Sequence, residues 1–274
     1  MPFTPSHAAA ALLFTRTPLL PAALVAGSVA PDLPYYLPVP VDRELTHEPL
    51  GVITADLVIA LVAFLAWQLV FRTPVLDLAP GWLRTRMPER PSGRWWPASQ
   101  APVVTAGLLL ISLVVGSVTH LAWDEFTHPG WLVDQVPFLQ AQAGPLVVHK
   151  WLQHASSVIG LTALGIFAAR WVRRTPSGAE PAIVTDRARR AAWIGIAAVF
   201  LVAACAGWAL ALFLRHEQGL PFALLDPGVV FQTARICVGA ALAAAVLVCL
   251  GWYGYRSRAL NNTRDSAGRL PRKS

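Results

Sequence analysis

Charged residues are scarce in this chain: they make up 14% of its 274 residues, whereas 55% are hydrophobic. With a mean hydropathy of +0.51, this composition is unusual for a soluble domain and ordinary for a polytopic membrane protein. The formal net charge of +7 could indicate nucleic-acid binding, but the arginines lie in short segments between apolar runs. We therefore expect the lipid bilayer as the partner and no nucleic acid.

Several common signs of covalent or redox chemistry are also missing. The sequence has three cysteines, and Cys205, Cys237 and Cys249 all lie inside apolar runs, which indicates packing rather than a disulfide framework. It contains no Gly-x-Ser-x-Gly motif and no glycine-rich phosphate loop. No basic segment precedes the first apolar stretch, so we expect no cleavable signal peptide. These absences favour water activated by a metal ion as the attacking group of any hydrolysis.

Long apolar runs dominate the sequence, and five of them are long enough to cross a bilayer, which takes about 20 residues. They cover residues 51–71, 101–122, 146–171, 191–214 and 234–253. The first thirty residues are apolar too, but Arg16, Pro18 and Pro21 interrupt them, which allows a sixth, kinked span or a hairpin of two short helices. The predicted fold is an all-α polytopic membrane helical bundle of five spans plus this N-terminal element.

The sequence divides into four consecutive parts. They are a membrane domain with most of the polar residues (1–172), a basic loop (173–190), two further spans (191–255) and a basic tail expected to be disordered (256–274). The arginines gather between alternate spans and in the tail, so the positive-inside rule places these segments in the cytoplasm. We therefore expect an integral protein of the bacterial inner membrane, with its histidines near the non-cytoplasmic face.

The stretch Val118–Gly130, VTHLAWDEFTHPG, ends the second apolar run. It places His120, Asp124 and His128 at successive intervals of four residues, which stacks them on one face of a helix. Imidazole and carboxylate ligands suit a divalent metal such as zinc, manganese or iron. The other interpretation is a polar helix end that meets water, and the spacing alone leaves both open.

Three further polar motifs precede this stretch: Ser6-His7, Pro31-Asp32-Leu33-Pro34 and Asp42-Arg43-Glu44-Leu45-Thr46-His47. Their order resembles the YdjM-type inner-membrane family of metal-dependent hydrolases. More closely, the chain resembles a bacterial membrane family called domain of unknown function 4184, through the segments MPFTPSHAAAA, LVAGSVAPDLPYY, LTHEPLG, THLAWDEFTHPGW and HKWLQHASSVIG. The close resemblance covers about residues 1–172, and the last two spans match only in being apolar.

The resemblance implies a site with a divalent cofactor, zinc or manganese, and five ligands or their immediate neighbours: His7, Asp32, His47, His120 and Asp124. Either Asp124 or Asp32 would accept the proton of the attacking water. Two positions depart from the YdjM-type pattern, because Asp42 replaces its first histidine and Pro34 its second aspartate. The loss of two ligands could reduce a two-metal site to one metal or abolish catalysis.

A second set of residues is expected to support this site: Asp42, Arg43, Asp56, His128, His149, Lys150 and His154. Asp42 could still supply an oxygen ligand. Asp56 is costly to bury in a span, so we expect it to pair with His47, Arg43 or Lys150, or to orient a ligand. Lys150 and His154 either bind an anionic group such as phosphate or contact lipid headgroups and a neighbouring helix.

These features predict a metal-dependent hydrolase at the outer membrane interface that acts on a lipid or lipid-linked phosphoester. The alternative is a non-catalytic integral membrane protein, either an ion or proton transporter or a structural subunit. Its His/Asp cluster would then bind an ion or lock helices together. The sequence leaves open whether the protein is an enzyme, and it predicts no oligomeric state.

Overall fold

The computed structural model describes residues 4–37, 40–42, 44–87, 101–178, 184–221, 223 and 226–268. Five of its helices are long and apolar enough to cross a membrane: Ala55–Leu78, Pro102–Gln135, Val148–Arg174, Asp186–Glu217 and Pro227–Arg258. The described strands are two residues long each. The expected all-α class and the five expected spans are therefore confirmed.

The chain forms two compact units, which we describe separately. The first comprises Met1–Ala66 and Pro91–Pro176, and the second comprises Trp67–Arg90 and Ser177–Ser274. The second unit therefore includes a segment that lies between the first two spans, as well as the C-terminal part of the chain. Each unit is therefore built from two separate segments of the chain. The division suggested by composition used four consecutive segments instead.

The first unit begins with two short helices, the 3-10 helix η1 (Thr4–Phe14) and α1 (Pro21–Val29). These two separate helices correspond to the expected N-terminal hairpin of two short helices and not to a single kinked membrane span. α1 packs against α7 (Pro102–Thr127) through Gly27 and Gly116. A Cβ atom on Gly27 would lie 2.1 Å from the carbonyl oxygen of Leu113, and one on Gly116 would lie 2.3 Å from that of Leu24. Only glycine allows two helix backbones to approach this closely.

Four short elements connect α1 to the first span: η2 (Ala30–Asp32), α2 (Leu33–Tyr36), η3 (Leu45–His47) and α3 (Pro49–Ile53). Gly51 in α3 is a second close approach, because a Cβ there would lie 1.9 Å from the carbonyl oxygen of Leu45 in η3. α4 (Ala55–Ala66) follows, and its Phe64 packs with Ala23 of α1 and Leu113 of α7 in the core of this unit.

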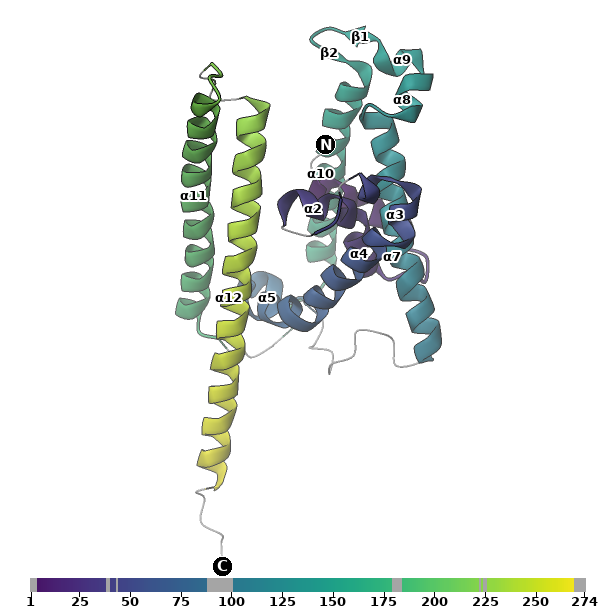
Figure 1. Ribbon diagram of the computed structural model, residues 1–274. Helices are drawn as coiled ribbons and strands as arrows, with labels where there is room; N and C mark the ends of the chain where they lie inside the picture. The colour runs from purple at the N-terminus through teal and green to yellow at the C-terminus, as the bar shows by residue number, and fades with distance from the viewer. Residues whose placement is uncertain are drawn as a thin grey trace, which may run out of the picture. The chain divides into compact units, whose positions relative to one another are not determined.

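The end of α7 continues into α8 (Trp131–Gln135) and α9 (Pro137–Gln140). A small antiparallel hairpin of β1 (Gln142–Ala143) and β2 (Leu146–Val147) then leads into α10 (Val148–Arg174). Figure 1 shows these short elements at one end of α7 and α10. α10 packs on η1 at Gly160, where a Cβ would lie 2.9 Å from the carbonyl oxygen of Ser6.

The second unit contains the π-helix η4 (Trp67–Phe71), α5 (Arg72–Leu78), α6 (Gly81–Arg84), α11 (Asp186–Glu217) and α12 (Pro227–Gly268). α11 and α12 lie side by side (Figure 1), and Gly207 of α11 packs against the side chain of Ile236. Nε1 of Trp252 donates a 2.7 Å hydrogen bond to the Asp77 carboxylate, which ties α12 to α5. α12 continues as a helix into the segment expected to be a disordered tail.

Candidate metal centre

Five polar side chains from four elements of the first unit converge on one region: His7, Asp32, His47, His120 and Asp124. Nε2 of His120 lies 3.6 Å from Oδ1 of Asp32 and 3.5 Å from Oδ2 of Asp124. Nε2 of His47 lies 3.6 Å from the same Asp32 oxygen and 3.9 Å from the same Asp124 oxygen. Nε2 of His7 lies 3.6 Å from Oδ1 of Asp124. These are the five positions that the family resemblance implied as metal ligands or their immediate neighbours.

Local structure explains how these residues reach each other. His120 and Asp124 lie one turn apart on α7, and both are buried there. Asp32 is the last residue of η2, and His47 is the last residue of η3. His7 lies in η1, which Gly160 of α10 allows to approach closely. The short elements and the glycine contacts thus bring residues far apart in the sequence to one point.

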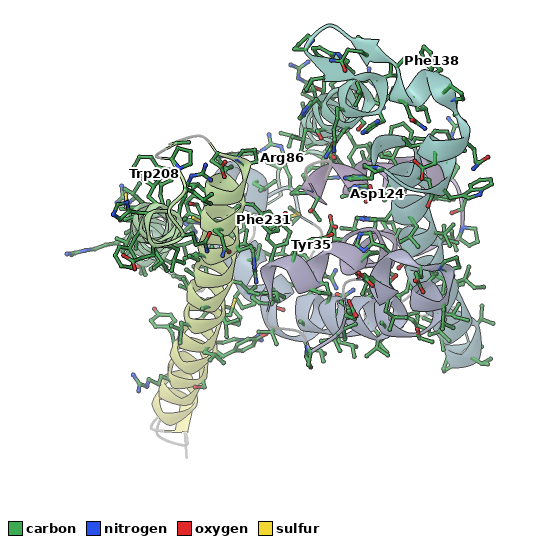
Figure 2. The ribbon with its side chains drawn as sticks, turned by 45° about the horizontal axis from the view of Figure 1, so that its top comes forward. Tyr35, Arg86, Asp124, Phe138, Trp208 and Phe231 are labelled. Atoms are coloured by element: carbon green, nitrogen blue, oxygen red, sulfur yellow. The ribbon has the colours of Figure 1, made fainter. Side chains whose placement is uncertain are left out.

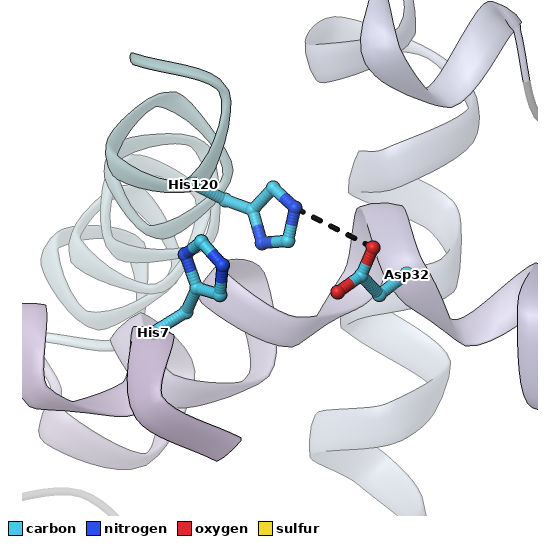
Figure 3. Close-up of side chains that lie close together, drawn as sticks. All are labelled: His7, Asp32 and His120. Carbon is cyan, nitrogen blue, oxygen red and sulfur yellow. Dashed lines mark ion pairs between the residues drawn. The ribbon is translucent and has the colours of Figure 1, made fainter. Parts of the chain in front are cut away.

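The ligand atoms form two overlapping groups that share His120. Within the described residues, one group consists of His7, Asp32 and His120 and the other of His47, His120 and Asp124, with ligand atoms within 4.8 Å of one another in each. Figure 3 shows the rings of His7 and His120 stacked beside Asp32, and their centroids are 4.0 Å apart. Ligands about 2.1 Å from a tetrahedral metal lie roughly 3.4 Å apart, so the distances within each group suit one ion.

Four inward-facing atoms of the cluster are buried and have no hydrogen-bond partner in the described part of the chain. They are Nε2 of His7, Oδ1 of Asp32, Nε2 of His120 and Oδ1 of Asp124. Buried polar atoms are normally hydrogen-bonded, and each unsatisfied one costs about 1–3 kcal/mol. Two imidazole nitrogens and two carboxylate oxygens that face each other in this way fit a divalent cation.

The outer atoms of His120 and Asp32 are held by hydrogen bonds. Nδ1 of His120 lies 2.8 Å from the carbonyl oxygen of Ser28. Because a carbonyl only accepts, Nδ1 carries the proton and Nε2 keeps its lone pair for the cluster. The Thr4 hydroxyl donates a 2.6 Å hydrogen bond to Oδ2 of Asp32 and leaves Oδ1 facing the histidines. Sequence reasoning missed Thr4 and the Ser28 carbonyl.

His47 is oriented in the same way by its neighbour. The Thr46 hydroxyl donates to the carbonyl oxygen of Pro31 at 3.0 Å, and Nδ1 of His47 lies 3.1 Å from that hydroxyl. Since the hydroxyl proton is directed to Pro31, the His47 Nδ1–H can donate to the hydroxyl oxygen, which directs Nε2 to the cluster. Thr46 is fully buried, so the Thr46–Pro31 hydrogen bond that fixes this arrangement is shielded from water.

The two cluster residues that lie outside the spans have pKa values suited to ligation. Burial lowers the pKa of His7 to about 4, so its imidazole is neutral at physiological pH. Burial alone would raise the pKa of Asp32, but the His47 imidazole 3.6 Å away, the nearby His120 and the hydrogen bond from Thr4 outweigh burial and lower it. A metal ion requires these deprotonated forms.

A polar cavity of about 750 Å³ opens onto one side of the cluster. It is lined by His47 and Asp124 of the cluster and by Tyr35, Asp42, Glu44, Glu125 and His128; Figure 2 labels Tyr35 and Asp124. Nδ1 of His128 lies 3.5 Å from Oδ2 of Asp124. Asp42 and His128 therefore lie at the mouth of the site, outside both ligand groups.

The remaining residues expected to support the site have other surroundings. Asp56 is buried in α4, and neither of its oxygens has a hydrogen-bond partner among the described residues, so the expected pairing with His47 or Lys150 is not found. Arg43 lies outside the described residues.

Three of the supporting residues lie on α10. Nδ1 of His149 bonds to the carbonyl oxygen of Leu139, Lys150 donates to Oε1 of Gln153 at 2.9 Å, and His154 is exposed. Gln153 in turn lies 3.4 Å from Nε2 of His128. Lys150 therefore reaches the mouth of the site only through Gln153 and His128.

Comparison with known proteins identifies one family. A family model described as "Domain of unknown function (DUF4184)" matches residues 1–250. The match extends past residue 172, where the close resemblance was expected to end, and includes α11 and part of α12. No curated protein and no solved structure shows a significant match.

Proposed function

The chain belongs to the DUF4184 family, and from that premise we propose that it is a membrane-embedded, metal-dependent hydrolase. Its His/Asp cluster would bind a divalent ion, with zinc or manganese favoured by the mixture of nitrogen and oxygen ligands. One observation carries this proposal: four buried ligand atoms face each other without hydrogen-bond partners in the described part of the chain. The resemblance to YdjM-type hydrolases supports the reaction type and stays a prediction.

The residues around the cluster suit hydrolysis of an ester or phosphoester. A divalent ion held by the cluster would lower the pKa of a bound water toward neutrality and would polarise the carbonyl or phosphoryl oxygen of the substrate. Asp124 lines the polar cavity and is the better placed of the two aspartates to accept the water proton, because Asp32 is 1% exposed. The water oxygen would bond to phosphorus or carbonyl carbon as the bond to the leaving oxygen breaks, and Asp124 would pass the proton it accepted to that leaving oxygen.

The proposed location is the inner membrane, with the cluster near the non-cytoplasmic face. The five membrane-spanning helices support an integral membrane protein. The gathering of arginines between alternate spans supports the orientation. Under this orientation the polar cavity opens near the headgroup region, so the expected substrate is a lipid or lipid-linked phosphoester.

Metal analysis of the purified protein tests the proposal directly. We expect stoichiometric zinc or manganese in the wild type and none in the double variant His120→Ala with Asp124→Ala. Added metal at 100 times its Kd should raise the unfolding free energy of the metal-free wild type by about 2.7 kcal/mol and leave the double variant unchanged. His216→Ala with Glu217→Ala, an exposed pair at the end of α11, is the matched control. Wild-type protein without stoichiometric metal would contradict the proposal.

One observation favours a second candidate function, the transport of an ion or proton. Asp56 is a buried carboxylate within a membrane span, and such groups often belong to ion pathways. Uptake of protons or metal ions into proteoliposomes that is lost in Asp56→Asn, with the metal content of the cluster retained, would support transport over hydrolysis. Equal uptake by Asp56→Asn and the wild type would exclude this role of Asp56.

A further inference from the structure

A second cavity, of about 520 Å³, lies between η1, α7 and α10 on another side of the cluster. We call it the apolar groove. It is lined mainly by hydrophobic side chains, among them Leu13, Ala122, Trp123, Phe126 and Ile159. The polar residues of its lining are the cluster residue His7 and the hydroxyl residues Ser6, Thr119 and Ser156. Both this groove and the polar cavity have volumes typical of small-molecule sites.

The cluster separates two cavities of opposite character. His7 lines the apolar groove and Asp124 lines the polar cavity, while Nε2 of His7 lies only 3.6 Å from Oδ1 of Asp124. A molecule that reached the cluster from both sides would have a hydrocarbon part next to His7 and a polar part next to Asp124. The bond at the cluster would then be the one that joins these two parts.

The position of the groove indicates what fills it. α7 and α10 are both long and apolar enough to span the membrane. Trp123, Phe126 and Ile159 on these helices are 41%, 44% and 67% exposed, which places Ile159 against the acyl chains and Trp123 and Phe126 at their boundary with the headgroups. The molecules available at that depth are membrane lipids, whose chains match the apolar lining.

We infer that the apolar groove holds a hydrocarbon chain of a membrane lipid and that the substrate class is therefore a lipid ester or phosphoester. This inference rests on the proposed hydrolase function. The lipid chain lies along η1 beside His7, and the headgroup occupies the polar cavity on the side of Asp124. Gly160 sets the closeness of η1 and α10 on which the groove depends.

Binding can be tested without hydrolysis. The wild type is placed in nanodiscs of phosphatidylglycerol that carries a photoreactive diazirine in the middle of one acyl chain. We expect labelled peptides that contain Leu13, Trp123, Phe126 or Ile159. Ala122→Trp fills the groove and should reduce this label severalfold, whereas Ala106→Trp, at an exposed site on the same helix outside the groove lining, should not. Equal labelling in the two variants would show lipid at the outer surface only and would overturn the inference.

Hydrolysis gives a second, separate readout. The probes are 4-nitrophenyl phosphodiesters of alkanols of increasing chain length, assayed with the metal-loaded protein. Each added methylene should lower KM about fourfold, which corresponds to ~0.8 kcal/mol, until the groove is full. Ala122→Trp should raise KM for the long-chain probes, and its metal content reports whether the cluster is intact. If it loses the metal, Ile159→Trp on the opposite helix replaces it.

The outcomes separate the two proposals. No hydrolysis of any probe by metal-loaded protein contradicts the proposed function, and the photolabel then still decides whether the groove binds lipid. Hydrolysis with a KM independent of chain length, together with equal labelling of the two tryptophan variants, overturns the lipid groove and leaves the hydrolase intact.

Discussion

Two buried aspartates, one in each unit, have opposite surroundings. Asp32 and Asp77 are 1% and 2% exposed. Asp77 accepts a 2.7 Å hydrogen bond from Nε1 of Trp252, so the chain itself supplies a donor. Oδ1 of Asp32 has no such donor among the described residues and faces Nε2 of His47 and His120 at 3.6 Å. The contrast separates a carboxylate that joins helices from one with an unsatisfied oxygen, which we propose binds an ion.

The two units also differ in how closely their helices approach at glycine. In the first unit, a Cβ on Gly116 would meet backbone atoms of α1, the nearest at 2.3 Å. In the second unit, a Cβ on Gly207 would meet side-chain atoms of Ile236 at 3.2 Å, which can move. The helix contact beside the cluster therefore leaves no room for a side chain, whereas the contact in the second unit can adjust.

The largest effect is expected from Gly116→Ala. The added methyl group must push α1 away from α7, so we expect a loss of about 3 kcal/mol or more in unfolding free energy. It also shifts the Ser28 carbonyl away from His120, so bound metal should be lost. Gly207→Ala should cost about 1 kcal/mol or less, because Ile236 can adopt another rotamer. Denaturation titrations in mixed micelles and metal analysis measure both, and similar losses in the two variants would remove the distinction between the units.

The next largest loss of unfolding free energy is expected from Trp252→Phe, which changes the second unit. It removes the indole donor and leaves the buried Oδ2 of Asp77 without this hydrogen bond, which should cost about 2–3 kcal/mol. The metal content should remain that of the wild type, since the cluster lies in the other unit. Loss of both stability and metal would show that the two units depend on each other.

The sequence predicted the membrane helices and the centre of the cluster, for identifiable physical reasons. Hydrophobic runs of about 20 residues define spans without knowledge of packing. The interval of four between His120 and Asp124 is a local property of a helix. His7, Asp32 and His47 came instead from a family resemblance, because nothing local shows that three separate short elements meet.

The parts that could not be predicted depend on long-range backbone contacts. The acceptor for His120 is the carbonyl of Ser28, 92 residues away, and a carbonyl has no signature in the sequence. The close approach at Gly27 and Gly116 that places it there depends on how two helices cross. For the same reason, the sequence did not indicate that Trp67–Arg90 belongs to the second unit.

Thr4→Val should have a smaller effect that is confined to the metal. It keeps the size of the side chain but removes the hydroxyl that donates to Asp32, so Asp32 can rotate away from the histidines. We expect metal affinity to fall by about 10–100-fold, as measured by competition with a chromophoric chelator. Thr4→Ser should retain most of the affinity. Thr233→Val, which removes a hydroxyl that donates to the Val229 carbonyl within α12, is the control from the second unit; an equal loss there would contradict a specific role for Thr4.

The smallest expected effect is a pH dependence that comes from His7. Burial lowers its pKa from the ordinary 6.5 to about 4, so below pH 6.5 the unfolded chain binds a proton that the folded chain does not. The contribution of His7 to the unfolding free energy is therefore fully present above pH 6.5 and is lost as the pH falls from 6.5 toward 4. Between pH 8 and pH 6, the metal-free protein should lose about 1 kcal/mol through this group.

Denaturation titrations in the presence of chelator measure this loss, and His7→Gln should remove it. His216→Gln, at an exposed position of the second unit, should keep the wild-type pH dependence. If His7→Gln and the wild type lose stability equally, His7 is hydrated in the metal-free protein. Water would then satisfy its Nε2, and the contrast between the unsatisfied cluster and the satisfied Asp77 would no longer hold for this residue.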